Sequence, residues 1–90
     1  MSDPNDDDLK QAFEQAVEDI HALIDRPDNE TMLRLYGLYK QGTEGDISGP
    51  NPGFFDFVGT AKYEAWTKLK GTGQHEVMQQ YVDLVQKLRS

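Results

Sequence analysis

The sequence contains no cysteine, and this absence excludes several kinds of structure and chemistry at once. Disulfide bonds, thiolate nucleophiles and every zinc site that uses cysteine are ruled out. With 90 residues, the chain has room for one hydrophobic core. Residues 1–8 are acidic and lack the basic and apolar regions of a secretory signal. We therefore expect a domain that is stabilised by packing alone and is cytoplasmic.

Basic residues are scarce, because 9 lysines and arginines stand against 16 aspartates and glutamates. The resulting formal charge of −7 argues against nucleic acid as a partner, since binding to a phosphate backbone requires a basic surface. The same charge disfavours anionic membranes. No apolar run reaches the length of a membrane span. We therefore expect neither nucleic-acid binding nor stable membrane insertion.

Residues that could form a hydrolytic or metal site are also few. The only serines are Ser2, Ser48 and Ser90, and the only histidines are His21 and His75. This is poor material for a serine, histidine and acid triad, because nucleophile and base must lie within hydrogen-bonding reach. Two histidines on separate predicted helices do not make a zinc site. The sequence predicts no enzyme activity, no cofactor and no metal ion.

The acidic N-terminal region matches a calcium-binding loop only in part. Such a loop needs glycine at its sixth position for a sharp turn, and Asp8 stands there. The interpretation that we favour is a flexible acidic extension over residues 1–8, followed by a folded domain over residues 9–90. The positions that do match the loop pattern are Asp3, Asn5, Asp7 and Glu14.

Apolar residues recur at intervals of three and four, and no segment alternates for long enough to predict a strand. In the first predicted helix the apolar face consists of Phe13, Val17, Ile20 and Ile24. Asp6, Asp7 or Asp8 is expected to cap its start, and Pro27 to close it.

A second helix is predicted to begin at Asp28 or Asn29, which are both favourable capping residues, and to end near Gly42 or Gly45. Residues 45–53 combine turn-forming residues with two prolines, so they are expected to form a long ordered loop. Loops of this length in a small domain are often functional.

The third helix is predicted to end at Gly71, which can adopt the left-handed conformation, and Thr72 is expected to cap the fourth. The apolar face of the fourth helix is formed by Val77, Tyr81, Leu84 and Leu88. Four amphipathic helices predict an all-α four-helix bundle with one long loop between the second and third helices.

The most informative cluster of residue types is Tyr36, Tyr39, Lys40 and Lys62. Tyr36 and Lys40 are four residues apart, so they share one helical face, and Tyr39 lies beside them. Aromatic rings next to an ammonium group suit a nucleobase and a phosphate. Tyrosines at helical spacing are, however, also common in cores, and lysines beside them often lie at the surface.

Residues 32–46 resemble the signature of acyl-CoA-binding proteins, in which Y-x-x-Y-K-Q is followed by a small residue, Thr and Gly-Asp. Residues 52–57 and 61–66 are similar to the family segments P-G-x-x-D-F and A-K-W-x-A-W at the same separation. Residues 69–72, with Met78 and Tyr81, resemble the family's entry into the fourth helix. The similarity is nearly continuous from Phe13 to Leu88.

This resemblance implies an up, down, down, up arrangement of helices and a monomeric carrier of long-chain acyl-CoA. The ligand is expected in a bowl formed mainly by the first three helices and the loop. The residues implied to contact or support the coenzyme A headgroup are Tyr36, Tyr39, Lys40, Lys62 and Tyr81. Those implied to line the site or touch the acyl chain are Phe13, Val17, Ile20, Met32 and Leu33.

The basic cluster is smaller here than in many members of the family. His21 occupies a position that often carries lysine, and we include it among the headgroup candidates. Val58 and Thr60 also replace frequent lysines. Two other functions remain as alternatives: an all-α module that binds a partner helix, and a thioesterase, for which no nucleophile is evident.

Overall fold

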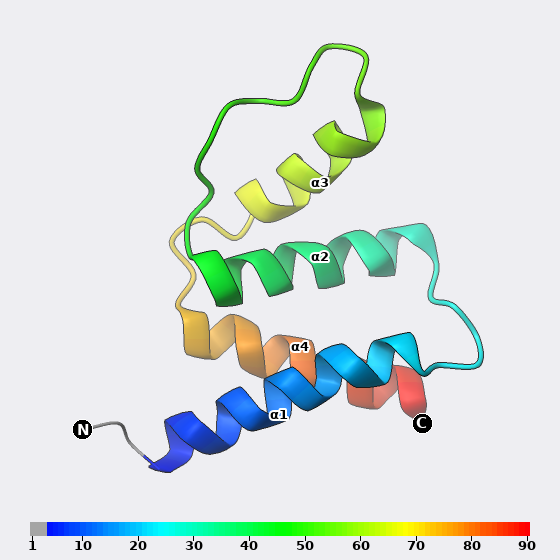
Figure 1. Ribbon diagram of the computed structural model, residues 1–90, viewed down its shortest axis with the longest axis vertical. Coiled ribbons are helices and arrows are strands. Elements are labelled where there is room, and N and C mark those ends of the chain that lie inside the picture. Colours follow the sequence, from blue (N-terminus) through cyan, green and yellow to red (C-terminus); the bar gives the residue numbers. More distant parts are fainter. Residues whose placement is uncertain (1–3) are drawn as a thin grey trace.

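Four α-helices form the computed structural model, which describes the backbone of residues 4–90 and the side chains from Asp7 onward. Their bounds are α1 Pro4–His21, α2 Asn29–Glu44, α3 Phe57–Thr67 and α4 Gln74–Arg89. Figure 1 shows α1 and α4 running in one direction and α2 and α3 in the other. This is the predicted up, down, down, up arrangement, and the described part of the chain contains no strand.

The first helix starts earlier than the sequence predicted. It begins at Pro4, so the positions Asp6, Asp7 and Asp8 lie inside its first turns and not at the cap position that was predicted for one of them. Proline suits this position because the first backbone N–H groups of a helix have no intrahelical partner. Residues 4–8, which were predicted to be a flexible extension, are therefore helical. Residues 1–3 lie outside the described part of the chain.

The first helix also ends earlier than predicted, at His21, before it reaches Pro27. Ile24 continues the apolar spacing but is 99% exposed, so its assignment to the core-facing side was wrong. Proline disfavours helical geometry at the residue before it, and the chain must also reverse direction before α2. Residues 22–28 therefore form the connection to α2 and do not extend α1.

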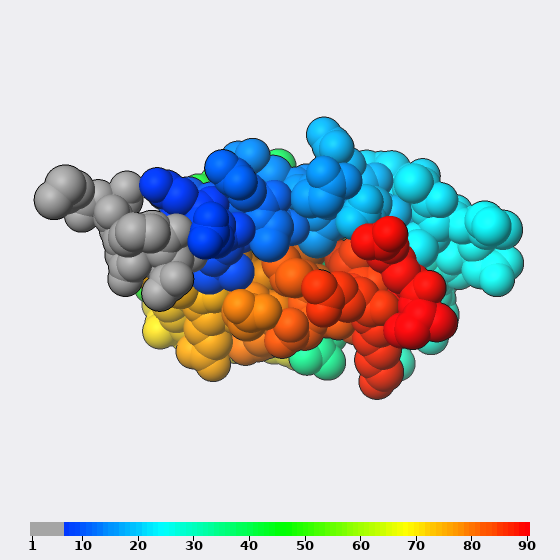
Figure 2. All heavy atoms as spheres, turned by 90° about the horizontal axis from the view of Figure 1, so that it is seen from below, coloured from blue at the N-terminus to red at the C-terminus, as the bar shows by residue number. Residues whose placement is uncertain are grey.

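The hydrophobic core is centred on α4, which packs against both α1 and α2, while α3 packs against α2. Figure 2 shows one side of the molecule covered by α1 and α4. The Cα atoms occupy a flat volume with principal extents of 43 × 36 × 15 Å. The buried residues of the core are Phe13, Ala16, Leu35, Leu38, Val77, Met78, Tyr81, Val82 and Val85.

Both ends of α2 have caps that the sequence predicted. Asp28 caps α2 by accepting a hydrogen bond from the Thr31 backbone N–H at 2.8 Å, and Gly45 ends that helix with a φ of 81°. Gly71 has the expected left-handed φ of 86°, but the prediction that it ends the third helix was wrong, because α3 ends at Thr67 with Lys68 as its cap. The expected cap of α4 was wrong, because Gly73, and not Thr72, occupies that position.

A set of hydrogen bonds ties the C-terminal end of α2 to the turn between α3 and α4. The buried Gln41 donates from Nε2 to Asp46 Oδ1 and to the Thr72 carbonyl, both at 2.9 Å. The same Asp46 oxygen accepts from the Gly71 backbone N–H at 2.8 Å. Trp66 Nε1 donates to the Gly45 carbonyl at 2.8 Å. We call these contacts the α2 clamp, since they hold three helices together around one helix end.

Asp46 is the charged member of the α2 clamp, and Asp46→Asn is expected to lower the melting temperature at neutral pH. The hydrogen bond from Gly71, with that from Gln41 and the charge of Lys70, lowers the pKa of Asp46 below its usual value of 3.8. A lowered pKa in the folded state gives stability that is present above the unfolded pKa and is lost as pH falls through the folded pKa.

Thermal unfolding of both proteins between pH 7 and pH 2 measures this effect. The difference in melting temperature should be largest near pH 7 and should shrink below about pH 4. Asp25→Asn, in the exposed connection after α1, is the control. A difference that is constant with pH would contradict the role given to the Asp46 charge.

The approach of α3 to α2 depends on the missing side chain of Gly37. A Cβ atom at this position would lie 2.6 Å from the carbonyl oxygen of Ala65, which is backbone and cannot rotate away. Gly37→Ala should therefore lower the melting temperature by separating the two helices, although alanine is the better helix former. Gly53→Ala, where no atom lies within 4 Å of the new Cβ, is the control and should change stability little.

Candidate functional site

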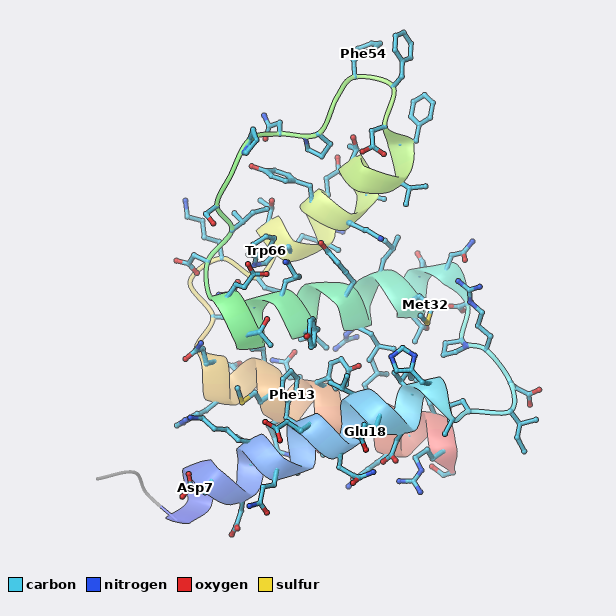
Figure 3. The ribbon with its side chains drawn as sticks, in the orientation of Figure 1. Asp7, Phe13, Glu18, Met32, Phe54 and Trp66 are labelled. Carbon is cyan, nitrogen blue, oxygen red and sulfur yellow. The ribbon has the colours of Figure 1, made fainter. Side chains whose placement is uncertain are left out.

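A pocket of about 360 Å³ opens between α1, α2 and α4. Within residues 4–90, the backbones of α1 and α2 do not pack on each other, and both helices rest on α4. Figure 3 shows Met32 on the side of α2 that faces α1. The residues that line this pocket, which we call the tyrosine pocket, are Val17, Ile20, His21, Met32, Leu35, Tyr36, Tyr39 and Tyr81.

Aromatic contacts fix two of the three tyrosines. The ring of Phe13 stacks on Tyr39 with centroids 6.0 Å apart and meets Tyr81 edge to face at 5.1 Å. Phe13 is only 4% exposed and does not line the tyrosine pocket. Its position is therefore behind the pocket wall, where it joins a ring from α2 to a ring from α4.

Two lysines lie over aromatic rings at the α3 side of α2. Lys62 Nζ is 5.3 Å from the centroid of the Tyr36 ring, and Lys40 Nζ is 4.9 Å from that of the Trp66 ring. Both distances are typical of cation–π contacts. Lys62 belongs to α3, so this helix contributes a charge beside the pocket although it provides none of the lining. The ligand bowl was predicted from the first three helices and the loop, whereas this pocket is lined by α1, α2 and α4.

Lys40 also forms an ion pair with Glu44, one helical turn further along α2. The hydrogen bond from Lys40 to Glu44 raises the pKa of the lysine above its usual 10.5, and burial opposes this effect. Lys40 is therefore charged at neutral pH, and its ammonium group is already partnered by a carboxylate.

Tyr81 contributes a buried phenol to the pocket. Burial, with a smaller effect of Tyr39, raises the pKa of Tyr81 to about 12. Its hydroxyl therefore stays protonated at neutral pH, and it can donate a hydrogen bond to an acceptor in the pocket.

His21 and Leu33 lie in different places relative to this pocket. His21 is exposed at the last turn of α1 and lines the pocket edge. Leu33 instead lines a second pocket of about 600 Å³ formed by α2, α3 and Gln80 of α4. Adjacent residues on a helix are separated by about 100°, so Met32 and Leu33 face different sides of α2.

Leu35, Glu44 and Trp66 belong to the site region but were not among its predicted residues. The spacing of four between Lys40 and Glu44 was a usable signal, because such pairs meet on a helix surface. The contact between Lys40 and Trp66 had no such signal, since it depends on how α3 packs against α2.

The described residues do not include a cluster of side chains that could bind a metal ion. Among the described residues, no three histidine, aspartate or glutamate side chains are close enough together to hold a metal ion. None of the helices in the described part of the chain is long and apolar enough to cross a membrane.

Sequence comparison identifies relatives of two lengths. Enoyl-CoA delta isomerase 2 of Rattus norvegicus is 48% identical over 90% of this chain, but the match covers only 21% of the isomerase. Acyl-CoA-binding protein homolog 1 of Caenorhabditis elegans is 40% identical over 86% of this chain and 90% of its own length. The chain thus spans about a fifth of the isomerase and most of the smaller protein.

Structure comparison agrees with the sequence matches. The crystal structure of Oryza sativa acyl-CoA-binding protein 2 superposes with a TM-score of 0.85 at 37% identity, covering 90% of each chain. The family model described as acyl CoA binding protein matches residues 10–85. The chain therefore belongs to the acyl-CoA-binding protein family.

Proposed function

We propose that this protein binds long-chain fatty acyl-CoA thioesters and carries them without changing them. The observation that carries the proposal is the tyrosine pocket, in which three phenolic rings and an apolar wall lie together, with two lysines beside them. Membership of the acyl-CoA-binding protein family supports the same ligand. A coenzyme A thioester needs this combination, because its headgroup is aromatic and anionic and its tail is apolar.

The headgroup is assigned to the tyrosine end of the site. An adenine ring can stack on Tyr36 or Tyr39, because flat aromatic groups pack well on tyrosine faces. Tyr81 supplies a protonated hydroxyl that can donate to a ring nitrogen. Lys62, above the Tyr36 ring, is placed to meet a phosphate attached to the bound nucleoside. His21, at the pocket edge, is the further candidate for a phosphate contact.

Lys40 must exchange one anionic partner for another when the ligand binds. Its ammonium group pairs with Glu44 in the free protein, and a phosphate would compete with that carboxylate. The ion pair between Lys40 and Glu44 lies on a helix surface, and such pairs contribute little free energy to the stability of a protein. Glu44 is therefore expected to reduce headgroup affinity without preventing binding.

The acyl tail is assigned to the apolar side of the same pocket, lined by Val17, Ile20 and Met32. A palmitoyl tail has about 14 methylenes, and their burial at ~0.8 kcal/mol each gives an upper bound of about 11 kcal/mol before ordering costs. Tail burial should dominate the affinity, while the headgroup contacts select coenzyme A. Leu33 would touch the tail only if the tail crosses to the pocket between α2 and α3.

The proposal includes no catalysis. The residues that line the tyrosine pocket include one histidine, His21, and no serine, threonine or lysine. A thioesterase needs an attacking group or an activated water that is held beside its base. The cytoplasmic location and the monomeric state stay predictions from the sequence.

Calorimetric titration tests the proposed ligand. Palmitoyl-CoA is expected to bind one to one, and much more tightly than free coenzyme A, because burial of the tail supplies most of the affinity. Palmitate should bind poorly because it lacks the nucleotide. Equal affinities for palmitate and palmitoyl-CoA would contradict the proposal, and so would release of free coenzyme A during incubation.

Lys40 and Glu44 provide a matched pair of variants with opposite expected effects. Lys40→Ala should weaken palmitoyl-CoA binding by about ten-fold or more, since one charge-assisted contact is lost. Glu44→Gln should strengthen binding by a few-fold at most, because the lysine no longer has a competing carboxylate. Both variants should unfold near the wild-type temperature. If Glu44→Gln weakens binding, the competition between Glu44 and phosphate is refuted.

The 3′-phosphate is tested by replacing the ligand with its dephospho form. Palmitoyl dephospho-CoA should bind more weakly, since Lys40 and Lys62 lose a charged partner. Wild-type affinity for palmitoyl-CoA should change little between low and moderate salt, because two lysines act at short range within a chain of net charge −7. Equal affinities for the two ligands would remove these lysines from phosphate recognition.

A further inference from the structure

An exposed apolar tip lies where the chain enters α3. It consists of Phe54, Phe55, Phe57 and Val58, whose exposed fractions run from 67% for Val58 to 88% for Phe54. The rings of Phe54 and Phe55 meet edge to face with centroids 5.0 Å apart. Figure 3 shows Phe54 at the end of the molecule farthest from α1. We call these four residues the aromatic tip, and neither proposed ligand subsite uses them.

Charge is nearly absent from the chain segment that contains the aromatic tip, although 28% of the whole chain is charged. Between Asp46 and Lys62 the sequence contains one charged residue, Asp56. Its Oδ1 accepts a hydrogen bond from the Gly59 backbone N–H at 2.8 Å and caps α3. The positive end of the helix dipole further offsets this carboxylate. The tip is therefore a locally neutral and apolar projection from an acidic protein.

The aromatic tip is held by backbone hydrogen bonds. The Asp56 N–H donates to the Gly53 carbonyl at 2.9 Å, and the Thr60 N–H donates to the Asp56 carbonyl at 2.9 Å. Pro50 and Pro52 further restrict the loop that leads to this turn. An ordered turn presents the rings at a smaller entropic cost than a flexible segment would.

We propose that the aromatic tip docks the protein reversibly on an uncharged lipid surface, with the phenylalanine rings inserted among the headgroups. Rings that project from a convex end can enter a fluid interface, which needs no complementary shape. Burial of aromatic surface would provide the driving force. An anionic surface is unfavourable, because the chain has a net charge of −7 and the tip offers no basic residue.

A second copy of the chain or another protein fits this projection less well. One aromatic residue buries about 150 to 250 Å², so three phenylalanines provide at most roughly 450 to 750 Å². A stable protein interface buries about 800 Å² on each partner, and it usually has a polar rim. The segment between Asp46 and Lys62 offers one charged group, Asp56, which is engaged as a helix cap. The size and composition therefore favour a lipid surface.

Helix α3 links the aromatic tip to one residue of the proposed headgroup site. Val58 and Lys62 are four residues apart on α3, so they share one helical face about one turn apart. Lys62 in turn lies over the Tyr36 ring of the tyrosine pocket. Docking would therefore place Lys62 on the helix nearest to the membrane, while the pocket itself lies on the other side of α2, towards α1. The role of Lys62 in the headgroup site rests on the proposed function, whereas the docking itself requires no ligand.

Flotation with phosphatidylcholine vesicles, in the absence of any acyl-CoA, tests the docking. The full chain should float with the vesicles, and moderate salt should not release it. The double variant Phe54→Ser, Phe55→Ser should bind them at least about ten-fold more weakly, since two rings are removed from the lipid. Ile24→Ser removes another fully exposed apolar side chain, in the connection after α1, and should bind as the wild type does.

Three results would overturn the proposal: no binding to phosphatidylcholine, tighter binding when phosphatidylserine is added, or equal loss in the double variant and in Ile24→Ser. Self-association that disappears in the double variant would identify a second copy of the chain as the occupant and would also refute lipid docking. Thermal unfolding verifies that each variant is folded. Titration with palmitoyl-CoA without vesicles is measured separately, so failure of docking and failure of acyl-CoA binding are distinguishable.

Discussion

The packing of both α1 and α2 on α4 is the constraint from which the tyrosine pocket arises. Each of the two helices buries its apolar side against α4, and their own backbones stay apart. The space that remains between them is lined by side chains of all three helices. Phe13 spans the back of this space through its contacts with Tyr39 and Tyr81. The same core contacts that stabilise the domain therefore also set the width of the pocket.

The family signature combines two physical roles. Its first half supplies Tyr36 and Tyr39 to the tyrosine pocket, and Lys40 to the α3 side of α2, where it lies over Trp66. Its second half forms the α2 clamp, in which Gln41 and Asp46 join the end of α2 to the turn before α4. The same segment therefore contributes to stability as well as to the proposed binding site.

The electrostatic arrangement is unusual for a site that is proposed to hold an anion, because the whole chain is strongly acidic. Lys40 and Lys62 are both placed over aromatic rings, which attract cations without neutralising their charge. Among the residues that the structure describes, Lys40 is also paired with a carboxylate, that of Glu44, and Lys62 is not. The neutral segment that contains the aromatic tip lies between the α2 clamp and Lys62, so the loop changes from charged to apolar and back within a short stretch.

The sequence by itself determined the number, order and type of the helices, because helical periodicity and capping residues such as Asp28 act locally. It also identified Tyr36, Tyr39, Tyr81, Val17, Ile20, Met32 and His21, which the structure brings together around one pocket. Their roles in binding stay predictions. Tertiary packing decided the rest. It left Ile24 exposed, moved Phe13 behind the pocket, and separated Leu33 from Met32. It also placed Lys40 over Trp66, which comes from another helix. Periodicity states which side of a helix is apolar, but the angle and distance between helices decide which apolar residues meet a core, a pocket or solvent.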